Sequence, residues 1–227
     1  TTGYEEAAGQ GALAGLNAAL LVRGEEQVVL SRDQAMIGVM VDDLVHQGVD
    51  EPYRLFTSRA EFRILLRQDN ALRRILPLAR RLGLLGEVEV RSAETRLEAE
   101  DAAYRAAGST ALSPDQVNPL LESAGGTTIS EPMRIRELCR RPGVGVGALL
   151  AVSGSEGDPE HAEWADIEIK YEGYLAKERS AAARLSELDE LRLPDGIEYH
   201  AITTISWEAR EKLTATKPTS IGQAGRI

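Results

Sequence analysis

The sequence predicts an all-α protein, and three observations support that prediction. Aromatic residues make up only 4% of the 227 residues, while alanine, leucine, glutamate and arginine are abundant, which favours helices over sheets. Hydrophobic residues reach 43%, enough for a buried core. Apolar residues recur at helical spacing in several stretches, which are separated by N-cap residues, prolines and glycines.

Residues 5–22 are expected to form the first helix, with two glutamates at its positive N-terminal end and Gly24 at its stop. Gly11 and Gly15 would leave one side of that helix bare. Two interpretations stay open: close packing against another element, or a ligand held at the N-terminus, where the segment TTGY exposes free N–H groups.

A second helix is expected over residues 33–46, stopped by Gly48, with an apolar stripe formed by Ile37, Met40, Val41 and Leu44. Asp42 and Asp43 are adjacent and point in different directions on a helix, so they are poor metal ligands as a pair. A capped or ion-paired surface is one interpretation of these two acids. Contact with the arginines that follow is the other.

Residues 53–81, called here the arginine segment, are the most unusual part of the chain. They contain eight arginines, no lysine and two acids, so this stretch carries a net charge of +6 in a chain of net charge −10. Arginine rather than lysine favours bidentate contact with phosphate or carboxylate.

Ser58 and Glu61 match the S-x-x-E capping box, which predicts a helix starting at residue 58. Such a helix would place three arginines at i, i+4 spacing on one face, namely Arg59, Arg63 and Arg67. Arg54 precedes the cap and Asn70 follows the helix, where it could contact a base or cap the helix end. The arginines either pair with acids of this acidic chain or bind a phosphate backbone.

Further helices are expected over residues 72–82, 87–107, 114–124 and 131–140. The start at Ser113-Pro114 and the stop at Gly125 are the clearest of these signals. Residues 143–159, rich in glycine and serine, are interpreted as a linker or hinge.

A long helix is expected from residue 159 to about residue 191, followed by a loop, a short helix capped by Ser206 and a last helix beginning at residue 219 or 220. Its segment KYEGYLAKER places two tyrosines among cations. Aromatics at this spacing either form part of the core or stack on nucleic acid. Gly173 inside the helix suggests close approach by another element.

Several types of chemistry find no support in the sequence. Cys139 is the only cysteine and is interpreted as an inert, buried thiol in a reducing compartment. The three histidines are scattered, so no metal site is expected, and neither a dinucleotide nor a P-loop fingerprint occurs. With no membrane span or signal peptide apparent, the chain is predicted to be cytoplasmic, and its first and last residues suggest a fragment.

Four separated stretches resemble the glucose-inhibited division protein A family (GidA, also MnmG). TTGYEEAAGQGALAGLNAAL at residues 1–20 resembles the family signature, with Ala12 in place of the usual larger aliphatic residue. Residues 37–71 resemble its most characteristic C-terminal stretch. KYEGYLAKE at residues 170–178 and KPTSIGQAGRI at the C-terminus follow in the family's order.

This resemblance implies an FAD- and NADH-dependent, homodimeric enzyme that acts with a partner GTPase on C5 of the tRNA wobble uridine. It implies the end of an FAD-binding domain at residues 1–30, a tRNA-binding helical domain at 31–145, a linker at 146–158 and a partner-docking subdomain at 159–227. The fragment alone is expected to be inactive and to bind no FAD.

The resemblance also implies roles for individual residues. Flavin contact is implied for Thr2, Gly3 and Tyr4, tRNA contact for Arg54, Arg59, Arg63, Arg67 and Asn70, and docking of the GTPase for Lys170, Tyr171, Tyr174 and Lys177. The alternative function is a purely protein-interacting helical domain whose arginines pair with acids.

Overall fold

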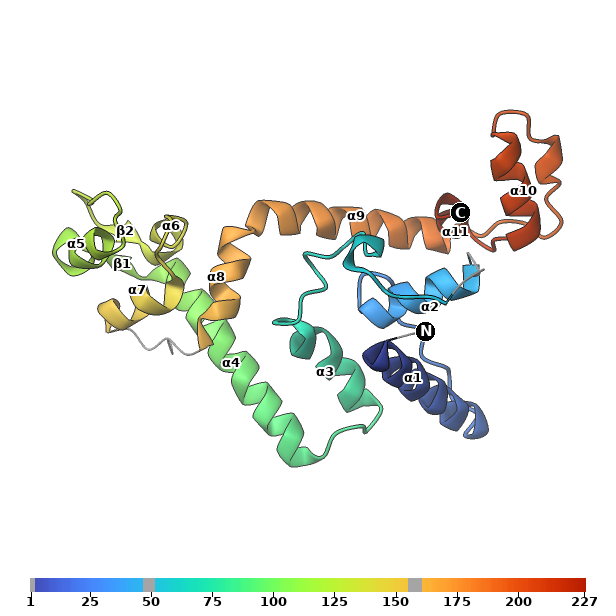
Figure 1. Cartoon of the computed structure of the whole chain (residues 1–227). Helices are drawn as coiled ribbons and strands as arrows, with labels where there is room; N and C mark the ends of the chain where they lie inside the picture. Colours follow the sequence, from blue (N-terminus) through green and yellow to red (C-terminus); the bar gives the residue numbers. More distant parts are fainter. Residues whose placement is uncertain (1–2, 47–51, 155–160) are drawn as a thin grey trace. The chain divides into compact units, whose positions relative to one another are not determined.

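The structure is a computed structural model that describes residues 3–46, 52–154 and 161–227. Within these ranges the chain is built of helices with one two-stranded ladder, which confirms the all-α prediction (Figure 1). The helices form two compact units. Unit 1 comprises residues 1–67 and 177–227, and unit 2 comprises residues 68–176.

Unit 1 begins with α1 (Tyr4–Val22) and α2 (Met36–His46), which pack on each other. They approach closely at Gly9, where an added Cβ would lie 3.2 Å from the Ile37 side chain. Gly11 and Gly15 meet no atom within 4 Å of an added Cβ in the described part of the chain. Close packing at these two glycines therefore stays a prediction, and no described residue of this chain provides it.

The loop before α2 is pressed against that helix at Gly38. An added Cβ there would lie 2.4 Å from the Ser31 carbonyl oxygen and 2.6 Å from that of Leu30. Only a residue without a side chain fits so close to backbone. The approach brings Arg32, which follows Ser31, over the C-terminal half of α2.

The remainder of unit 1 is the short 3₁₀ helix η1 (Thr57–Arg59) and the C-terminal elements. These are the end of α9 (Glu172–Glu190), η3 (Tyr199–Ala201), α10 (Trp207–Thr216) and α11 (Ile221–Gly225). The predicted caps are confirmed: Ser206 Oγ accepts from the Ala209 N–H, and Ser220 Oγ accepts from the Gln223 N–H. Arg226 then donates to Asp189 of α9 at 2.9 Å.

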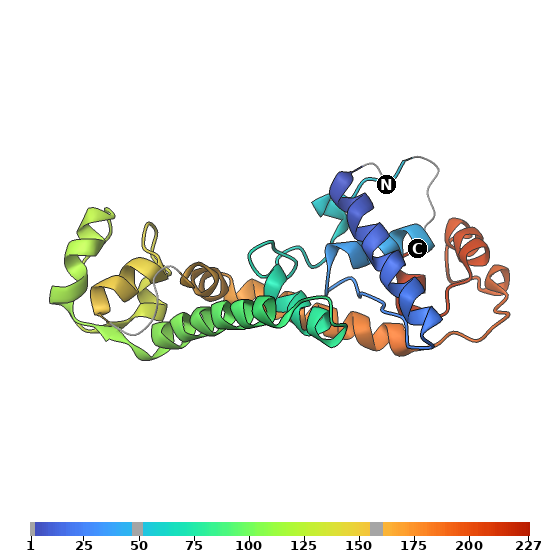
Figure 2. The same cartoon turned by 90° about the horizontal axis from the view of Figure 1, so that it is seen from below.

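Unit 2 is organised along the 23-residue helix α4 (Glu87–Ser109). The short helices α5 (Pro114–Ser123), α6 (Ile135–Leu138) and α7 (Val146–Ser153) gather at its C-terminal end, as both views show (Figures 1 and 2). The other helices of the unit are α3 (Ala71–Arg81) and α8 (Glu163–Lys170). Strands β1 (Ala111–Leu112) and β2 (Met133–Arg134) pair antiparallel, with Leu112 opposite Met133.

Three predictions for this region are wrong. Residues 146–153 of the expected linker form α7, because Val146, Leu149 and Leu150 are apolar and are buried in the core of unit 2. Residues 155–159 of that linker lie outside the described residues. The long helix expected from residue 159 is divided into α8 and α9 at Tyr171, and an added Cβ on Gly173 would meet open space in place of the expected neighbour.

Candidate nucleic-acid interface

The part of the arginine segment in unit 1, residues 53–67, is not the helix that the capping box predicts. Only η1 is helical there, and Ala60 is already extended (φ −91°, ψ 115°). The capping box fails because the Glu61 carboxylate binds a different partner. Both of its oxygens accept from Arg32 Nε, at 2.9 and 3.1 Å.

Arg32 is a buried cation at the centre of unit 1, with its side chain only 8% exposed. Besides Glu61, its guanidinium donates to Asp43 at 2.6 Å, to Asp42 at 2.9 Å and to the Arg59 carbonyl at 3.2 Å. Burial alone would lower the pKa of Arg32, but hydrogen bonds to Glu61 and Asp43 raise the pKa above its ordinary value. The residue therefore stays charged and joins α2 to residues 59–61.

Asp43 also meets the arginine segment, which confirms one of the two interpretations of the paired acids. The Tyr53 hydroxyl donates to Asp43 at 2.8 Å, and burial together with this bond raises the pKa of Tyr53. The Arg59 guanidinium lies 4.9 Å from the centre of the Tyr53 ring and 3.8 Å from Asp43. Arg59 is thus partly neutralised by an internal acid, although its side chain remains 43% exposed.

Two further carboxylates bind the backbone of the segment. Glu6 of α1 accepts from the Leu55 N–H at 2.8 Å. Glu178 of α9 accepts from the N–H groups of Ile64 and Leu65, at 3.1 and 3.0 Å. Together with Arg32, these glutamates fix residues 55–65 at three points.

Arg54 and Arg63 are exposed on this fixed segment. Neither forms an ion pair with a carboxylate among the residues that the structure describes. The Arg54 guanidinium lies 6.0 Å from the centre of the exposed Phe56 ring. Two guanidinium groups without an internal acid, on an anchored backbone, are suited to bind an external anion.

Several other arginines of the segment are bound by internal groups. Arg67 donates to the Ile64 carbonyl at 2.7 Å. In unit 2, Arg73 pairs with Glu100 and Asp101 and stacks on Trp164 at 3.8 Å, and Arg80 pairs with Glu94.

Asn70 stands at the N-cap position of α3 and is only 7% exposed. Its side chain makes no cap hydrogen bond, and Oδ1 accepts from Arg74 Nε at 2.8 Å. The helix expected from residue 58, whose end Asn70 was predicted to cap, does not form, so that role is wrong. Contact with a base stays a prediction.

The residues predicted to contact flavin lie at the start of α1. Thr2 lies outside the described residues. The Gly3 N–H donates to Glu6 at 2.7 Å, and the Tyr4 side chain is 93% exposed. Glu6 occupies the Gly3 donor and the first turn carries two acids. Contact of Thr2, Gly3 and Tyr4 with flavin in the intact enzyme stays a prediction.

The predicted docking residues lie around the junction of α8 and α9. Lys170 pairs with Asp166 at 2.6 Å. Tyr171 and Tyr174 have ring centres 6.3 Å apart and are 47% and 62% exposed, so they belong to the surface of unit 2 and not to its core. Lys177, in unit 1, is exposed.

Cys139 is fully buried, and burial, with a contribution from Asp166, raises the pKa of its thiol to about 11. No three metal-ligating side chains come together among the described residues. In the same ranges, no helix has both the length and the apolar character to cross a membrane.

Sequence reasoning identified the exposed arginines but missed the residues that hold them. Arg32, Glu6 and Glu178 lie far from residues 53–67 in sequence. Glu6 and Glu178 belong to stretches that resemble the family, but their contacts with residues 53–67 have no signal in the sequence. The only local signal for Arg32 was Gly38, a glycine within an apolar helix.

Two family models match the chain. Residues 88–179 match the "tRNA modifying enzyme MnmG/GidA C-terminal helical domain", and residues 181–227 match the "tRNA modifying enzyme MnmG/GidA C-terminal helical bundle". The solved structure of Aquifex aeolicus GidA in its form II crystal is similar with a TM-score of 0.76 and 38% identity, and the match covers 100% of this chain and 36% of that one.

Curated relatives agree with this result. The enzymes named tRNA uridine 5-carboxymethylaminomethyl modification enzyme MnmG from Flavobacterium psychrophilum and Porphyromonas gingivalis are 42% and 43% identical to the whole chain. The chain spans 38% of the length of each. From these matches and the shared helical fold, we conclude that the chain belongs to the MnmG/GidA family and corresponds to its C-terminal helical region.

Proposed function

We propose that this chain is the tRNA-binding and partner-binding region of an FAD-dependent enzyme that modifies C5 of the tRNA wobble uridine together with a GTPase. The observation that carries the tRNA-binding part is the pair Arg54 and Arg63, exposed and without an internal acid on an anchored segment. The relatives named above act on tRNA uridine by their names, so the external anion is proposed to be the tRNA backbone.

The charge distribution supports this proposal. The chain as a whole carries a charge of −10 and would repel nucleic acid. The acids that contact residues 53–67 are bound by Arg32 or by backbone N–H groups and form no ion pair with Arg54 or Arg63. A local positive surface can therefore persist in an acidic protein. In this proposal Arg59 and Arg67 contribute weaker contacts.

The test is a gel-shift titration of tRNA against the 227-residue chain at two salt concentrations. Arg54→Ala with Arg63→Ala should weaken binding at low salt by about tenfold or more and lower the slope of log K against log salt by about 1.5, because two phosphate contacts are lost. The control, Arg91→Ala with Arg105→Ala, removes two exposed charges from α4 and should change binding little. If both double variants lost tRNA affinity equally, the loss would be explained by net charge alone, and the assignment of Arg54 and Arg63 would be contradicted.

The alternative is a domain that binds only protein. The exposed tyrosines Tyr171 and Tyr174 favour it, since exposed aromatic side chains are enriched at protein interfaces. A chain of this kind would bind its GTPase partner and show no tRNA shift even at low salt. The same titration therefore separates the two functions.

A further inference from the structure

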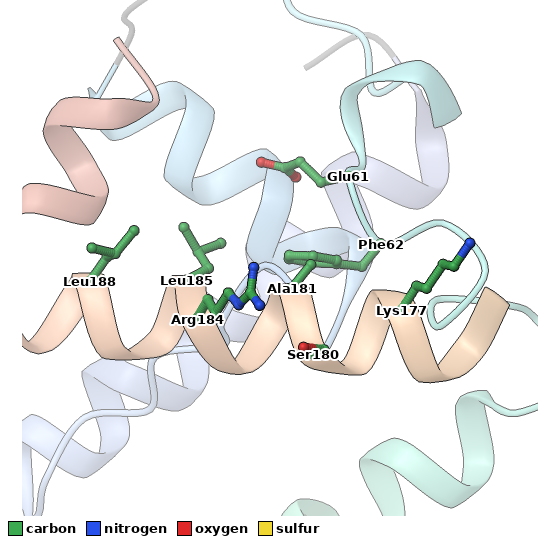
Figure 3. Close-up of a pocket in the computed structure, with 8 residues that line it drawn as sticks. All are labelled: Glu61, Phe62, Lys177, Ser180, Ala181, Arg184, Leu185 and Leu188. Carbon is green, nitrogen blue, oxygen red and sulfur yellow. The ribbon is translucent and has the colours of Figure 1, made fainter. Parts of the chain in front are cut away.

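Unit 1 contains a shallow groove between α9 and the end of the anchored arginine segment, with a volume of about 500 Å³ (Figure 3). Residues of α9 at helical spacing form one wall, from Lys177 through Ala181 and Arg184 to Leu185 and Leu188. Phe62 and Glu61 form the other. In Figure 3 the two leucines and Lys177 project from α9 toward the side on which Phe62 and Glu61 lie.

The lining of the groove is mainly apolar. Leu188 is 40% exposed and Leu185 is half-buried, and they lie three residues apart on one helix face. Phe62, on the opposite wall, is only 5% exposed. Apolar side chains left exposed together on a helix mark a surface for interaction.

The groove also carries positive charge. The residues of α9 that line the groove include Lys177 and Arg184 and no acid. Glu178, next to Lys177, accepts from the backbone N–H groups of Ile64 and Leu65. Within the described part of the chain, neither cation forms an ion pair with a carboxylate. The acid on the opposite wall, Glu61, is bound by Arg32. An occupant with negative charge is therefore favoured.

The shape and chemistry favour protein over RNA. Stacking of a base needs an exposed planar ring, and Phe62 is buried while the leucines are aliphatic. An aliphatic strip about two helical turns long, from Ala181 to Leu188, with cations beside it, fits the apolar face of a second helix. We propose that this groove binds an acidic amphipathic helix of a partner protein, an inference that rests on the partner-binding part of the proposed function.

The test uses a labelled synthetic helical peptide with leucines at i, i+3, i+4 and i+7 and glutamates beside them, together with a copy that carries lysines in place of the glutamates. Fluorescence anisotropy with the 227-residue chain should show the acidic peptide binding at least about tenfold more tightly. Lys177→Glu with Arg184→Glu should invert that preference. Leu188→Ser should weaken both peptides, and circular dichroism would verify that each variant keeps its helices.

Arg91→Glu with Arg105→Glu on α4 reverses the same number of charges and should leave the preference unchanged. Equal binding of both peptides, or of neither, would overturn the proposal. The proposal would also be overturned if Lys177→Glu with Arg184→Glu lost as much tRNA affinity as Arg54→Ala with Arg63→Ala, because the groove would then bind RNA. Self-association that Leu188→Ser abolishes would assign the groove to a second copy. If the chain fails to bind tRNA but prefers the acidic peptide, the tRNA-binding part of the proposed function is contradicted and the groove proposal is not.

Discussion

At the scale of single residues, the acids near the arginine segment bind its backbone and leave its exposed side chains charged. Glu6 and Glu178 accept from main-chain N–H groups, and Glu61 is held by Arg32. A buried N–H without a partner costs about 1–3 kcal/mol, so these carboxylates stabilise an irregular backbone. Excess acid and an exposed basic surface are thus compatible.

Cys139 provides a pH-dependent prediction at the same scale. Its pKa of about 11 exceeds that of an unfolded thiol, about 8.5–9, so the unfolded state loses its proton first as pH rises. Stability from the neutral thiol is therefore fully present below about pH 9 and is lost as pH rises through 11. Between pH 8 and 11, urea unfolding should show the parent losing on the order of 2 kcal/mol more than Cys139→Ala.

Cys139→Ala is the reference for the parent protein. The tyrosines and lysines that titrate in the same pH range are common to both, so the difference between the two pH curves reports the thiol alone. The variant will start from a lower stability because it leaves a small cavity. Parallel pH curves for the two proteins would show that the thiol ionises in the native state as easily as in the unfolded state.

At the scale of elements, the contact of α2 with residues 30–31 decides where Arg32 lies. Gly38→Ala would place a Cβ 2.4 Å from a backbone oxygen, which no rotamer change can relieve. We expect a loss of about 1–3 kcal/mol in the free energy of unfolding. Gly15→Ala in α1 is the matched control, since nothing lies within 4 Å of its added Cβ, and it should stabilise by about 0.5–1 kcal/mol. Chemical denaturation of both variants measures the difference, and equal effects would contradict the close approach at Gly38.

Elements whose boundaries are set locally could be predicted from the sequence. Ser113-Pro114, Ser206 and Ser220 mark helix starts through bonds to residues three positions away, and the structure places α5, α10 and α11 there. The capping box at Ser58 failed because Arg32, 29 residues from Glu61, binds that carboxylate. The sequence around Ser58 gives no sign that a distant arginine will bind the Glu61 carboxylate.

In the candidate site, too, the features set locally could be predicted and those set by distant contacts could not. Exposed arginines could be predicted from composition and charge, because exposure is the usual state of a charged residue. Which of them lack an internal acid could not, since Arg59 meets Asp43 and Arg73 meets Glu100 only after the chain folds. Residues 146–153 were misjudged because Gly143, Gly145 and Gly147, together with the serines that follow, outweighed the apolar residues that α7 buries.

At the scale of the whole molecule, the two units are stabilised in different ways. Unit 2 has a continuous apolar core that extends from Ala103 to Ile169. A small buried cluster in unit 1 consists of Val39, Ala60 and Leu66, and it adjoins the charged group around Arg32. Unit 1 therefore depends more on a single side chain.

Arg32→Ala should accordingly destabilise one unit and not the other. Removing the guanidinium leaves Asp43 buried and Glu61 without its partner, which costs about 3–5 kcal/mol for a buried pair. Native-state hydrogen exchange should show faster exchange at amides of α2 and residues 61–66, with amides of α4 and α7 unchanged. Arg80→Ala, which breaks only the exposed pair with Glu94, should cost no more than about 1 kcal/mol. Uniform acceleration across both units in the Arg32 variant would mean that the units unfold as one, and would contradict the assignment of Arg32 as the residue that holds unit 1 together.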